Sequence, residues 1–309
     1  MPWRMKNMNF NKIFVLGAGA IGSVYGAFLS KQNDVALIGN KTHVKAVNSK
    51  GLTISGDTNE TFYLRADTEI HEIPEKTLII LTTKAYDLAK TAEKTKKLLK
   101  KDTIILILQN GLGNEEIVKR AAGDEARILR GITAMAAEFF EPGKIRFWNG
   151  ETTIEQNGVA KKIAKIFNEC MLKTTLYNDI KKEVWNKMIV NCVANPLSAI
   201  FNVKNYEIAA DSLKIVRHKI VKECVEVGKA EGITFPEHLE EKIDEKISTY
   251  TNFSSMYQDI VKGKRTEIDF LNGKVVELGR KHHITTPVNE TLVCLVKFRE
   301  EKNEIPRKD

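Results

Sequence analysis

Gly17-Ala-Gly-Ala-Ile-Gly22 follows an apolar run at residues 11–16 and leads into a helical pattern at residues 24–30. In a strand–turn–helix unit, the first glycine permits a tight turn, the second lets backbone N–H groups approach a pyrophosphate, and the third allows close helix packing. A glycine-rich turn without a ligand is the alternative, but the flanking patterns are those that a dinucleotide-binding motif requires. The residues expected to contact a dinucleotide are Gly17, Ala18, Gly19, Ala20, Ile21 and Gly22.

Strand and helix patterns continue to alternate after this motif. The runs at residues 34–38, 77–82 and 103–108 are apolar nearly throughout, which is typical of parallel strands buried on both faces. Alternating strands and helices predict an α/β fold with a doubly wound parallel sheet, here a Rossmann domain at residues 1–178. Short strand patterns at residues 132–155 are expected to extend that sheet.

The pattern changes after about residue 178, where long amphipathic helices replace the alternation. These helical patterns cover residues 179–193, 212–231, 236–246, 255–262 and 266–282. We therefore predict an all-α C-terminal domain at residues 179–309.

Composition excludes several classes of protein. The apolar stretches are far shorter than the ~20 residues that a membrane span needs, and the four cysteines form no metal-binding or disulfide pattern. The net charge of +8 is spread along the chain, and its densest basic stretch, residues 90–101, reads as the solvated face of an amphipathic helix. We expect a cytoplasmic protein with an anionic small-molecule ligand, no nucleic-acid or membrane partner and no metal.

The residues after the second strand bear on the choice of cofactor. An NAD site normally has an acid there for the ribose 2′-hydroxyl, whereas an NADP site prefers a cation. This chain has Asn40 and Lys41 and no acid, which favours NADPH and leaves NADH open. Lys41 as an ordinary solvated lysine is the alternative interpretation.

Two polar residues lie where later strands are predicted to end, Lys84 and Asn110. Open α/β sheets bind ligands outside the carboxyl ends of their strands, so both side chains are expected near a nicotinamide and its substrate. For Asn110, which precedes a glycine, simple turn chemistry is an adequate alternative.

In the second domain, Lys187 and Asn191 are four residues apart and share a helix face, which Asn195 continues if the helix runs on. Apolar residues occupy much of the remaining circumference, so this helix is predicted to be buried. Lys187 then either extends to solvent or is a desolvated lysine with a lowered pKa that acts as a proton donor.

Further along, Ser255 and Gln258 fit a capping box, and Glu267 fits the first turn of a helix. Those structural roles are sufficient explanations for both residues. The functional alternative is that the helix start at Ser255 binds a substrate carboxylate and that Glu267 borders the substrate.

Taken together and in order, these motifs resemble the ketopantoate reductases (2-dehydropantoate 2-reductases), over residues 12–297. The motifs are Gly17-Ala-Gly-Ala-Ile-Gly, Thr83-Lys-Ala, Asn110-Gly-Leu-Gly, Trp185-Asn-Lys-Met-Ile-Val-Asn-Cys-Val-Ala-Asn-Pro-Leu, Ser254-Ser-Met-Tyr-Gln-Asp and Thr266-Glu-Ile-Asp-Phe-Leu-Asn-Gly. That family pairs a Rossmann domain with a helical domain and reduces 2-oxo acids with NADPH.

The resemblance implies roles for residues at matching positions. Lys187 is similar to the family's general acid, and Glu267 to the carboxylate beside it. The resemblance assigns Lys84 and Asn110 to the cofactor, with Asn110 also near the substrate. The substrate-binding residues that it implies are Asn110, Asn191, Asn195, Asn252 and Ser255. One departure is that Asn40 stands where family members often carry an arginine.

The resemblance implies NADPH-dependent reduction of ketopantoate to pantoate, in the route to pantothenate and coenzyme A, with hydride from nicotinamide C4. Another branched 2-oxo acid on the same scaffold is one alternative, and a non-catalytic NADP(H)-binding sensor is another. Apolar helices in the second domain also leave a homodimer open.

Overall fold

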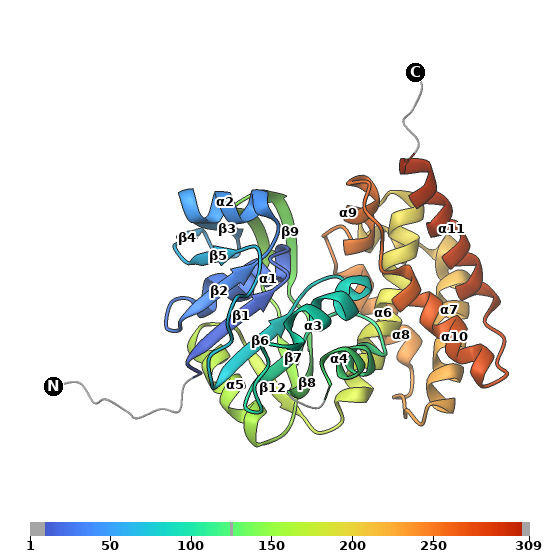
Figure 1. Cartoon of the computed structure of the whole chain (residues 1–309). Coiled ribbons are helices and arrows are strands. Elements are labelled where there is room, and N and C mark those ends of the chain that lie inside the picture. Colours follow the sequence, from blue (N-terminus) through green and yellow to red (C-terminus); the bar gives the residue numbers. More distant parts are fainter. Residues whose placement is uncertain (1–9, 124–125, 305–309) are drawn as a thin grey trace. The chain divides into compact units, whose positions relative to one another are not determined.

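The computed structural model describes residues 10–123 and 126–304, and they form two units (Figure 1). The first unit comprises residues 10–109 and 114–180, and the second comprises residues 110–113 and 181–304. The short segment 110–113 therefore groups with the helical unit, which the sequence pattern does not indicate. We describe each unit by itself.

The first unit is built on an eight-stranded sheet with the strand order β12-β11-β8-β7-β6-β1-β2-β5. Its strands are β1 (Lys12–Leu16), β2 (Val35–Ile38), β5 (Arg65–Asp67), β6 (Thr77–Leu81), β7 (Ile104–Ile107), β8 (Arg127–Thr133), β11 (Thr152–Glu155) and β12 (Thr174–Tyr177). Every neighbouring pair is parallel except β8 and β11. Because β2 and β6 flank β1 on opposite sides, the strand order reverses at β1, where such sheets bind ligands. The predicted α/β fold is confirmed.

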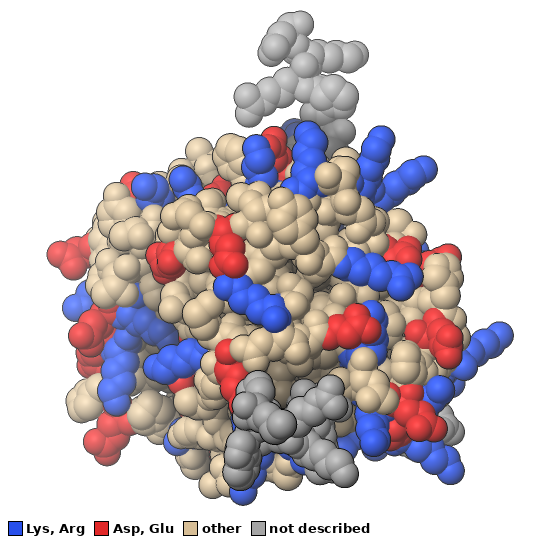
Figure 2. All heavy atoms as spheres, turned by 90° about the vertical axis from the view of Figure 1, so that its left-hand side faces the viewer, with Lys and Arg blue, Asp and Glu red and all other residues tan. Residues whose placement is uncertain are grey.

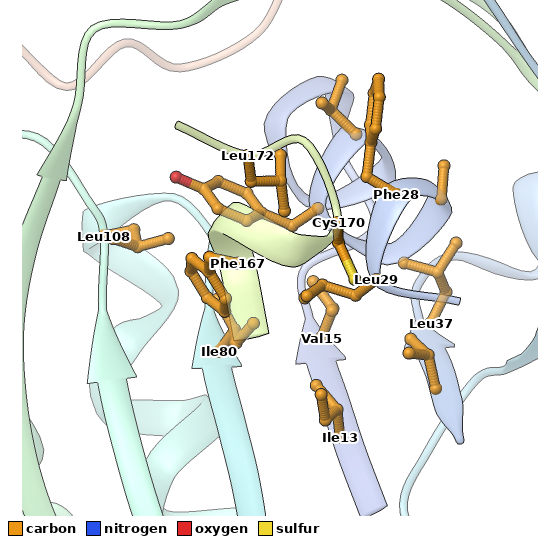
Figure 3. Close-up of a cluster of buried hydrophobic side chains, with 14 of the residues drawn as sticks. Ile13, Val15, Phe28, Leu29, Leu37, Ile80, Leu108, Phe167, Cys170 and Leu172 are labelled. Atoms are coloured by element: carbon orange, nitrogen blue, oxygen red, sulfur yellow. The ribbon is translucent and has the colours of Figure 1, made fainter. Parts of the chain in front are cut away.

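Successive side chains of the apolar strands point alternately into two hydrophobic layers, one on each face of the sheet. Ile13 and Val15 of β1 pack with Phe28 of α1 (Ala20–Leu29) and Phe167 of α5 (Gly158–Glu169), as Figure 3 shows. The next residues along β1, Phe14 and Leu16, belong to the opposite layer. That layer is covered by α3 (Leu88–Lys96) and α4 (Asn114–Ala122). Burial on both faces explains why these strands carry no polar alternation.

The expectation for residues 132–155 is only partly right. β11 joins the main sheet, but β9 (Ala136–Glu141) and β10 (Lys144–Trp148) pair with β3 (Leu52–Gly56) and β4 (Glu60–Phe62) in a separate four-stranded sheet. β10 alternates buried and exposed residues, so it has one apolar face, and its Phe147 ring packs on Phe28 of α1. A strand with one apolar face suits a small sheet that covers a helix, whereas the central sheet is buried on both sides.

The described part of the second unit is helical. Its helices are α6 (Ile180–Phe201), α7 (Lys214–Ala230), α8 (Leu239–Ser248), α9 (Ser255–Val261), α10 (Asn272–Lys281) and α11 (Pro287–Glu304), with α6 beginning at the last residue of the first unit. α6 continues through Pro196 to Phe201, and α10 begins six residues later than the helical pattern suggested, after a 3₁₀ turn at Ile268–Phe270. α11 was not expected. Its apolar residues Leu292 and Val296 are buried, but polar residues dominate the rest of its sequence.

The charged side chains of the described residues form no block of one sign on the face that Figure 2 shows. On the face shown in Figure 2, basic side chains are interspersed with acidic ones. Within residues 10–123 and 126–304, no helix is long and apolar enough to span a membrane, and no cluster of three metal-ligating side chains is present. Cys170, Cys192 and Cys224 are buried free thiols, and Cys294 is exposed.

Candidate dinucleotide and substrate sites

The loop after β1 takes its shape from two glycines that the surrounding backbone requires. Gly17 has φ of +105°, and a Cβ there would lie 2.4 Å from the backbone nitrogen of Thr83. A Cβ on Gly22 would lie 2.2 Å from the carbonyl oxygen of Gly17. Neither contact can be accommodated, so both glycines are explained by packing within the protein.

Gly19 differs because the protein itself does not require a glycine there. Its φ is −79°, which any residue adopts, and a Cβ would meet only the Gly17 carbonyl oxygen, at 3.9 Å. Gly19 is also the N-cap of α1, and no side chain caps that helix end. Unfilled space above the N-terminus of a ten-residue helix fits the approach of a pyrophosphate.

Asn40 and Lys41 begin α2 (Lys41–Lys50), directly after β2 and Gly39. Asn40 is the N-cap, and its Oδ1 accepts a hydrogen bond from the backbone N–H of His43 at 2.9 Å. Both Asn40 and Lys41 are exposed, and no acid lies between Gly39 and His43. Asn40 thus has a structural role that the sequence pattern did not reveal, and its exposed side chain still lies at the end of β2.

His43 connects the first turn of α2 to α1, the helix that begins within the glycine motif. Its Nδ1 accepts a hydrogen bond from the Gly143 N–H, so its Nε2 carries the proton and faces the Ser23 hydroxyl, 3.1 Å away. Ser23 follows the last glycine of the motif, and His43 is fully buried. Burial lowers the pKa of His43, which keeps the ring neutral and this bridge intact.

Lys84 lies where β6 ends, next to the glycine loop. Thr82 on the same stretch donates from its hydroxyl to the Gly17 carbonyl oxygen at 2.9 Å, and Thr83 packs against Gly17. Lys84 is half-buried and precedes a short 3₁₀ turn at Ala85–Asp87. Within the first unit, Lys84 and residues 17–22 thus belong to neighbouring strand ends.

In the second unit, Lys187, Asn191 and Asn195 occupy one line along α6, and the expected continuation of the helix to Asn195 is confirmed. Lys187 and Asn191 are half-buried and Asn195 is 6 % exposed, in a stretch that is otherwise nearly all buried. Among the described residues, the side-chain amides of Asn191 and Asn195 have no hydrogen-bond partner. Neither amide is among the fully buried polar atoms without a partner, so both remain accessible to a ligand with polar groups.

The capping box expected at Ser255 is wrong. Ser254 is the N-cap of α9, because its hydroxyl accepts from the Tyr257 N–H at 3.0 Å. Ser254 is buried and lies 2.6 Å from the hydroxyl of Ser198, which also contacts the Asn195 carbonyl oxygen. Ser255 is the exposed first residue of α9, so its hydroxyl is not used by the cap.

The structure adds Asn205, which the sequence analysis missed. Its backbone N–H donates to the carbonyl oxygen of Asn252 at 3.1 Å, and Asn252 itself is half-buried. Asn205 is only 4 % exposed, and its Oδ1 has no hydrogen-bond partner among the described residues. Its burial and its contact with Asn252 distinguish it, and that contact joins segments 47 positions apart, so no local pattern could have identified it.

Glu267 is buried, at 8 % exposure, but it lies before the 3₁₀ turn at Ile268–Phe270 and not in the first turn of a helix as expected. The preceding residue is tied to α11, since the Thr266 N–H donates to the carboxylate of Glu300 at 2.6 Å. Asn110 belongs to the same unit, and a Cβ on its neighbour Gly111 would lie 2.4 Å from the Phe270 carbonyl oxygen. The segments that carry Asn110 and Glu267 are therefore packed together.

The predicted residues thus divide between the two units. The first unit holds residues 17–22, Asn40, Lys41 and Lys84, which are the expected dinucleotide contacts. The second unit holds the expected catalytic and substrate residues, namely Asn110, Lys187, Asn191, Asn195, Asn252, Ser255 and Glu267.

Comparison with known proteins identifies the family of the chain. Residues 13–158 match the model of "Ketopantoate reductase PanE/ApbA", and residues 179–300 match its C-terminal model. The chain belongs to the ketopantoate reductase family. It is 39 % identical to a 2-dehydropantoate 2-reductase of Pyrococcus horikoshii, over 94 % of this chain and 97 % of that protein. A Streptococcus pyogenes protein of the same name is 33 % identical over 93 % of this chain and 97 % of the relative.

Solved structures show the same fold. A ketopantoate reductase of this family from Ralstonia eutropha has a TM-score of 0.89 at 29 % identity, covering 95 % of this chain and all of the other. D-mandelate dehydrogenase in complex with NADH and anilino(oxo)acetate has a TM-score of 0.88, also at 29 % identity and with the same coverage. The predictions of family, fold and oxidoreductase class are confirmed, and the individual site residues stay predictions.

Gly19 and Gly22 should respond differently to replacement by alanine, because only Gly22 is enclosed by the protein itself. Gly19→Ala should leave the thermal stability nearly unchanged but weaken NADPH binding by about tenfold or more, because only a bound pyrophosphate would meet the new Cβ. Gly22→Ala should instead destabilise the fold by about 1–3 kcal/mol or more through overpacking. Thermal unfolding and fluorescence titration with NADPH measure the two effects.

Gly158→Ala is the matched control, because a Cβ at Gly158 meets nothing within 4 Å and the residue begins α5. This variant should change neither stability nor binding appreciably. Unaltered NADPH affinity in Gly19→Ala would show that no pyrophosphate approaches Gly19.

Proposed function

We propose that this chain reduces 2-dehydropantoate (ketopantoate) to pantoate with NADPH, as a cytoplasmic enzyme of the route to pantothenate and coenzyme A. The observation that carries the proposal is the line of Lys187, Asn191 and Asn195 along α6, in a chain related to named 2-dehydropantoate 2-reductases over nearly its whole length. A proton donor and two unpartnered amides suit a substrate with a ketone and further polar groups.

Lys187 is the proposed general acid. Bound NADPH supplies hydride to the carbonyl carbon of the 2-oxo acid, and the negative charge that develops on the oxygen needs a proton. The ammonium group of Lys187 donates that proton, so that the ketone becomes an alcohol and the lysine is left neutral until solvent reprotonates it. Before transfer, the same positive charge stabilises the developing oxyanion. Glu267, buried in the same unit, is proposed to orient the substrate oxygen and the lysine.

The asparagines suit the remaining polar groups of the substrate. Asn191 and Asn195 lie one and two helical turns from Lys187, so each amide meets the substrate at a different distance from the reacting carbon. Asn205 and Asn252, joined through the backbone, extend this set, with the distal hydroxyl as their proposed target. An amide both donates and accepts, which matches a hydroxyl. Ser255, whose hydroxyl the helix cap leaves available, is proposed to bind the carboxylate.

The first unit supports NADPH as the cofactor. The uncapped start of α1 above Gly19 fits the pyrophosphate. The exposed Asn40 and Lys41 fit the 2′-phosphate, because they bring one positive charge and no carboxylate to the end of β2. Lys84 and Asn110 are proposed to contact the cofactor, with Asn110 also near the substrate.

A second candidate is the reduction of an aromatic 2-oxo acid. D-mandelate dehydrogenase, which shares the fold, is described with NADH and anilino(oxo)acetate. In this chain, the rings of Phe253 and Tyr257, at the start of α9, are stacked on each other with centroids 4.3 Å apart. Both are half-buried, so they offer an apolar surface beside Asn252 and Ser255.

Initial rates distinguish these candidates. Ketopantoate and 2-oxo-2-phenylacetate should be compared as acceptors, each with NADPH and with NADH in parallel. We expect the highest kcat/KM for ketopantoate with NADPH. Faster reduction of the phenyl acid would favour the second candidate. Binding of NADPH without turnover of either acid would leave the dinucleotide site standing and refute both substrate assignments.

Asn40→Asp tests the cofactor assignment without removing the helix cap. The aspartate keeps an oxygen for the His43 N–H, but its charge repels a 2′-phosphate and can accept from a ribose 2′-hydroxyl. We expect the ratio of kcat/KM for NADPH over NADH to fall by about tenfold or more. The matched control is Asn157→Asp, since Asn157 caps α5 through the Val159 and Ala160 N–H groups and should not alter this ratio. An unchanged ratio in Asn40→Asp would remove Asn40 from the ribose site.

Lys187→Met tests the general acid while retaining most of the side-chain volume. Loss of the proton donor should lower kcat by about 10²–10⁴-fold, whereas the NADPH dissociation constant should stay nearly the same. Lys181→Met is the control, because Lys181 is an exposed lysine on the same helix. If NADPH affinity falls as far as kcat does, Lys187 serves cofactor binding or the fold, and the acid is another group.

A further inference from the structure

Gln109 is a buried polar residue just beyond the end of β7. Gln109 is 5 % exposed, and its Nε2 donates a hydrogen bond to the Thr83 hydroxyl at 3.3 Å. Its Oε1 is fully buried and has no hydrogen-bond partner among the residues that the structure describes. A buried amide arm without a partner destabilises the fold, so its presence needs an explanation.

Rotating the amide does not remove this cost. The Thr83 hydroxyl can donate or accept, so it can pair with either arm of the Gln109 side chain. In one orientation the unpartnered arm is a carbonyl oxygen, and in the other it is an NH₂ group. Either way, one arm of the amide has no hydrogen-bond partner among the described residues.

Gln109 lies beyond the end of β7, at the edge of the sheet where open parallel sheets bind ligands. Thr83, its neighbour, supplies the backbone nitrogen that leaves no room for a side chain at Gly17. β1, β6 and β7 are consecutive parallel strands, with Leu16 beside Leu81 and Leu81 beside Ile107. The glycine loop follows β1, Thr83 follows β6 and Gln109 follows β7. Gln109 therefore lies beyond the third of three neighbouring strand ends, where open parallel sheets bind ligands.

The strand order indicates which half of the cofactor this arm meets. Asn40 follows β2, on one side of β1, and the proposed 2′-phosphate contact places the adenosine half there. β6 and β7 lie on the other side of β1. A dinucleotide whose pyrophosphate crosses the glycine loop must then extend its nicotinamide nucleoside toward β6 and β7.

We propose that Gln109 binds the nicotinamide nucleoside of the cofactor through its unpartnered amide arm. This proposal rests on the dinucleotide site of the proposed function. The ribose hydroxyls and the carboxamide of that nucleoside share the required chemistry, because each can donate and accept a hydrogen bond. Gln109 links this end of the cofactor to Thr83 and hence to the glycine loop.

Two substitutions distinguish direct binding of the cofactor by Gln109 from an indirect role in which Gln109 only holds Thr83 in place. Gln109→Met removes both arms of the amide at nearly constant volume, and Thr83→Val removes the same Gln109–Thr83 hydrogen bond but leaves the amide in place. We expect Gln109→Met to weaken NADPH binding by about tenfold and Thr83→Val to weaken it clearly less, by fluorescence titration or calorimetry. Gln109→Asn, one methylene shorter, should also weaken binding and serves if the methionine variant does not fold.

Fragments of the cofactor locate the contact. The affinity of 2′,5′-ADP, which lacks the nicotinamide nucleoside, should be unchanged by Gln109→Met. A loss with 2′-phospho-ADP-ribose would place the contact at the ribose, and an unchanged affinity would place it at the carboxamide. Equal losses in Gln109→Met and Thr83→Val, a loss for 2′,5′-ADP, or no loss for NADPH would each overturn the proposal. Failure of the unmodified protein to bind NADPH would instead refute the proposed function.

Discussion

The close approach of two backbones, at the ends of β1 and β6, is the constraint on which the first unit depends. Gly17 has no side chain, and only for that reason can its Cα lie against the backbone of Thr83. The Thr82 hydroxyl then bonds the Gly17 carbonyl oxygen, and Gly22 packs over the same oxygen. These contacts fix where α1 begins, and so they fix the direction of the N–H groups that face the space above Gly19. The motif therefore serves packing at two of its glycines and leaves the third for a ligand.

The neutral state of His43 extends this arrangement to α2. Its ring accepts from Gly143 and faces Ser23, so a proton on Nδ1 would place two N–H groups against each other. Burial lowers the pKa of His43, and the bridge is accordingly retained at neutral pH. α2, with Asn40 at its start, is thereby held to the helix that follows the glycines. The starts of α1 and α2, which form the proposed cofactor site, are thus held by hydrogen bonds and close packing within the first unit.

Local patterns predicted the parts of the molecule that local chemistry determines. The glycine motif, the apolar parallel strands and the line of Lys187, Asn191 and Asn195 along α6 could each be read from short stretches. Pairing across long distances could not, which is why β9 and β10 were expected in the wrong sheet. Ser254 and Ser255 are chemically identical, and only the backbone path decides which of them caps α9. Asn205 and Gln109 each have a buried amide oxygen without a partner among the described residues, which no sequence pattern displays.

Buried amides in this chain differ in how fully their polar atoms are hydrogen-bonded within the protein. Asn289 is fully buried, accepts from Asn272 through Oδ1 and donates to Glu223 through Nδ2, so its polar atoms are used within the helical core. Asn195 and Asn205 are almost as buried, but among the described residues neither the Asn195 side chain nor the Asn205 Oδ1 has a hydrogen-bond partner. An amide placed to stabilise the core would be selected with its partners, as Asn289 is, because an unsatisfied one destabilises the fold. Asn272 in the helical core also has an Oδ1 without a partner among the described residues, so a missing partner alone does not identify a ligand site. The role proposed for Asn195 rests also on its place in the line of Lys187 and Asn191 along α6, and an amide held there in advance lowers the entropy that ligand binding must overcome.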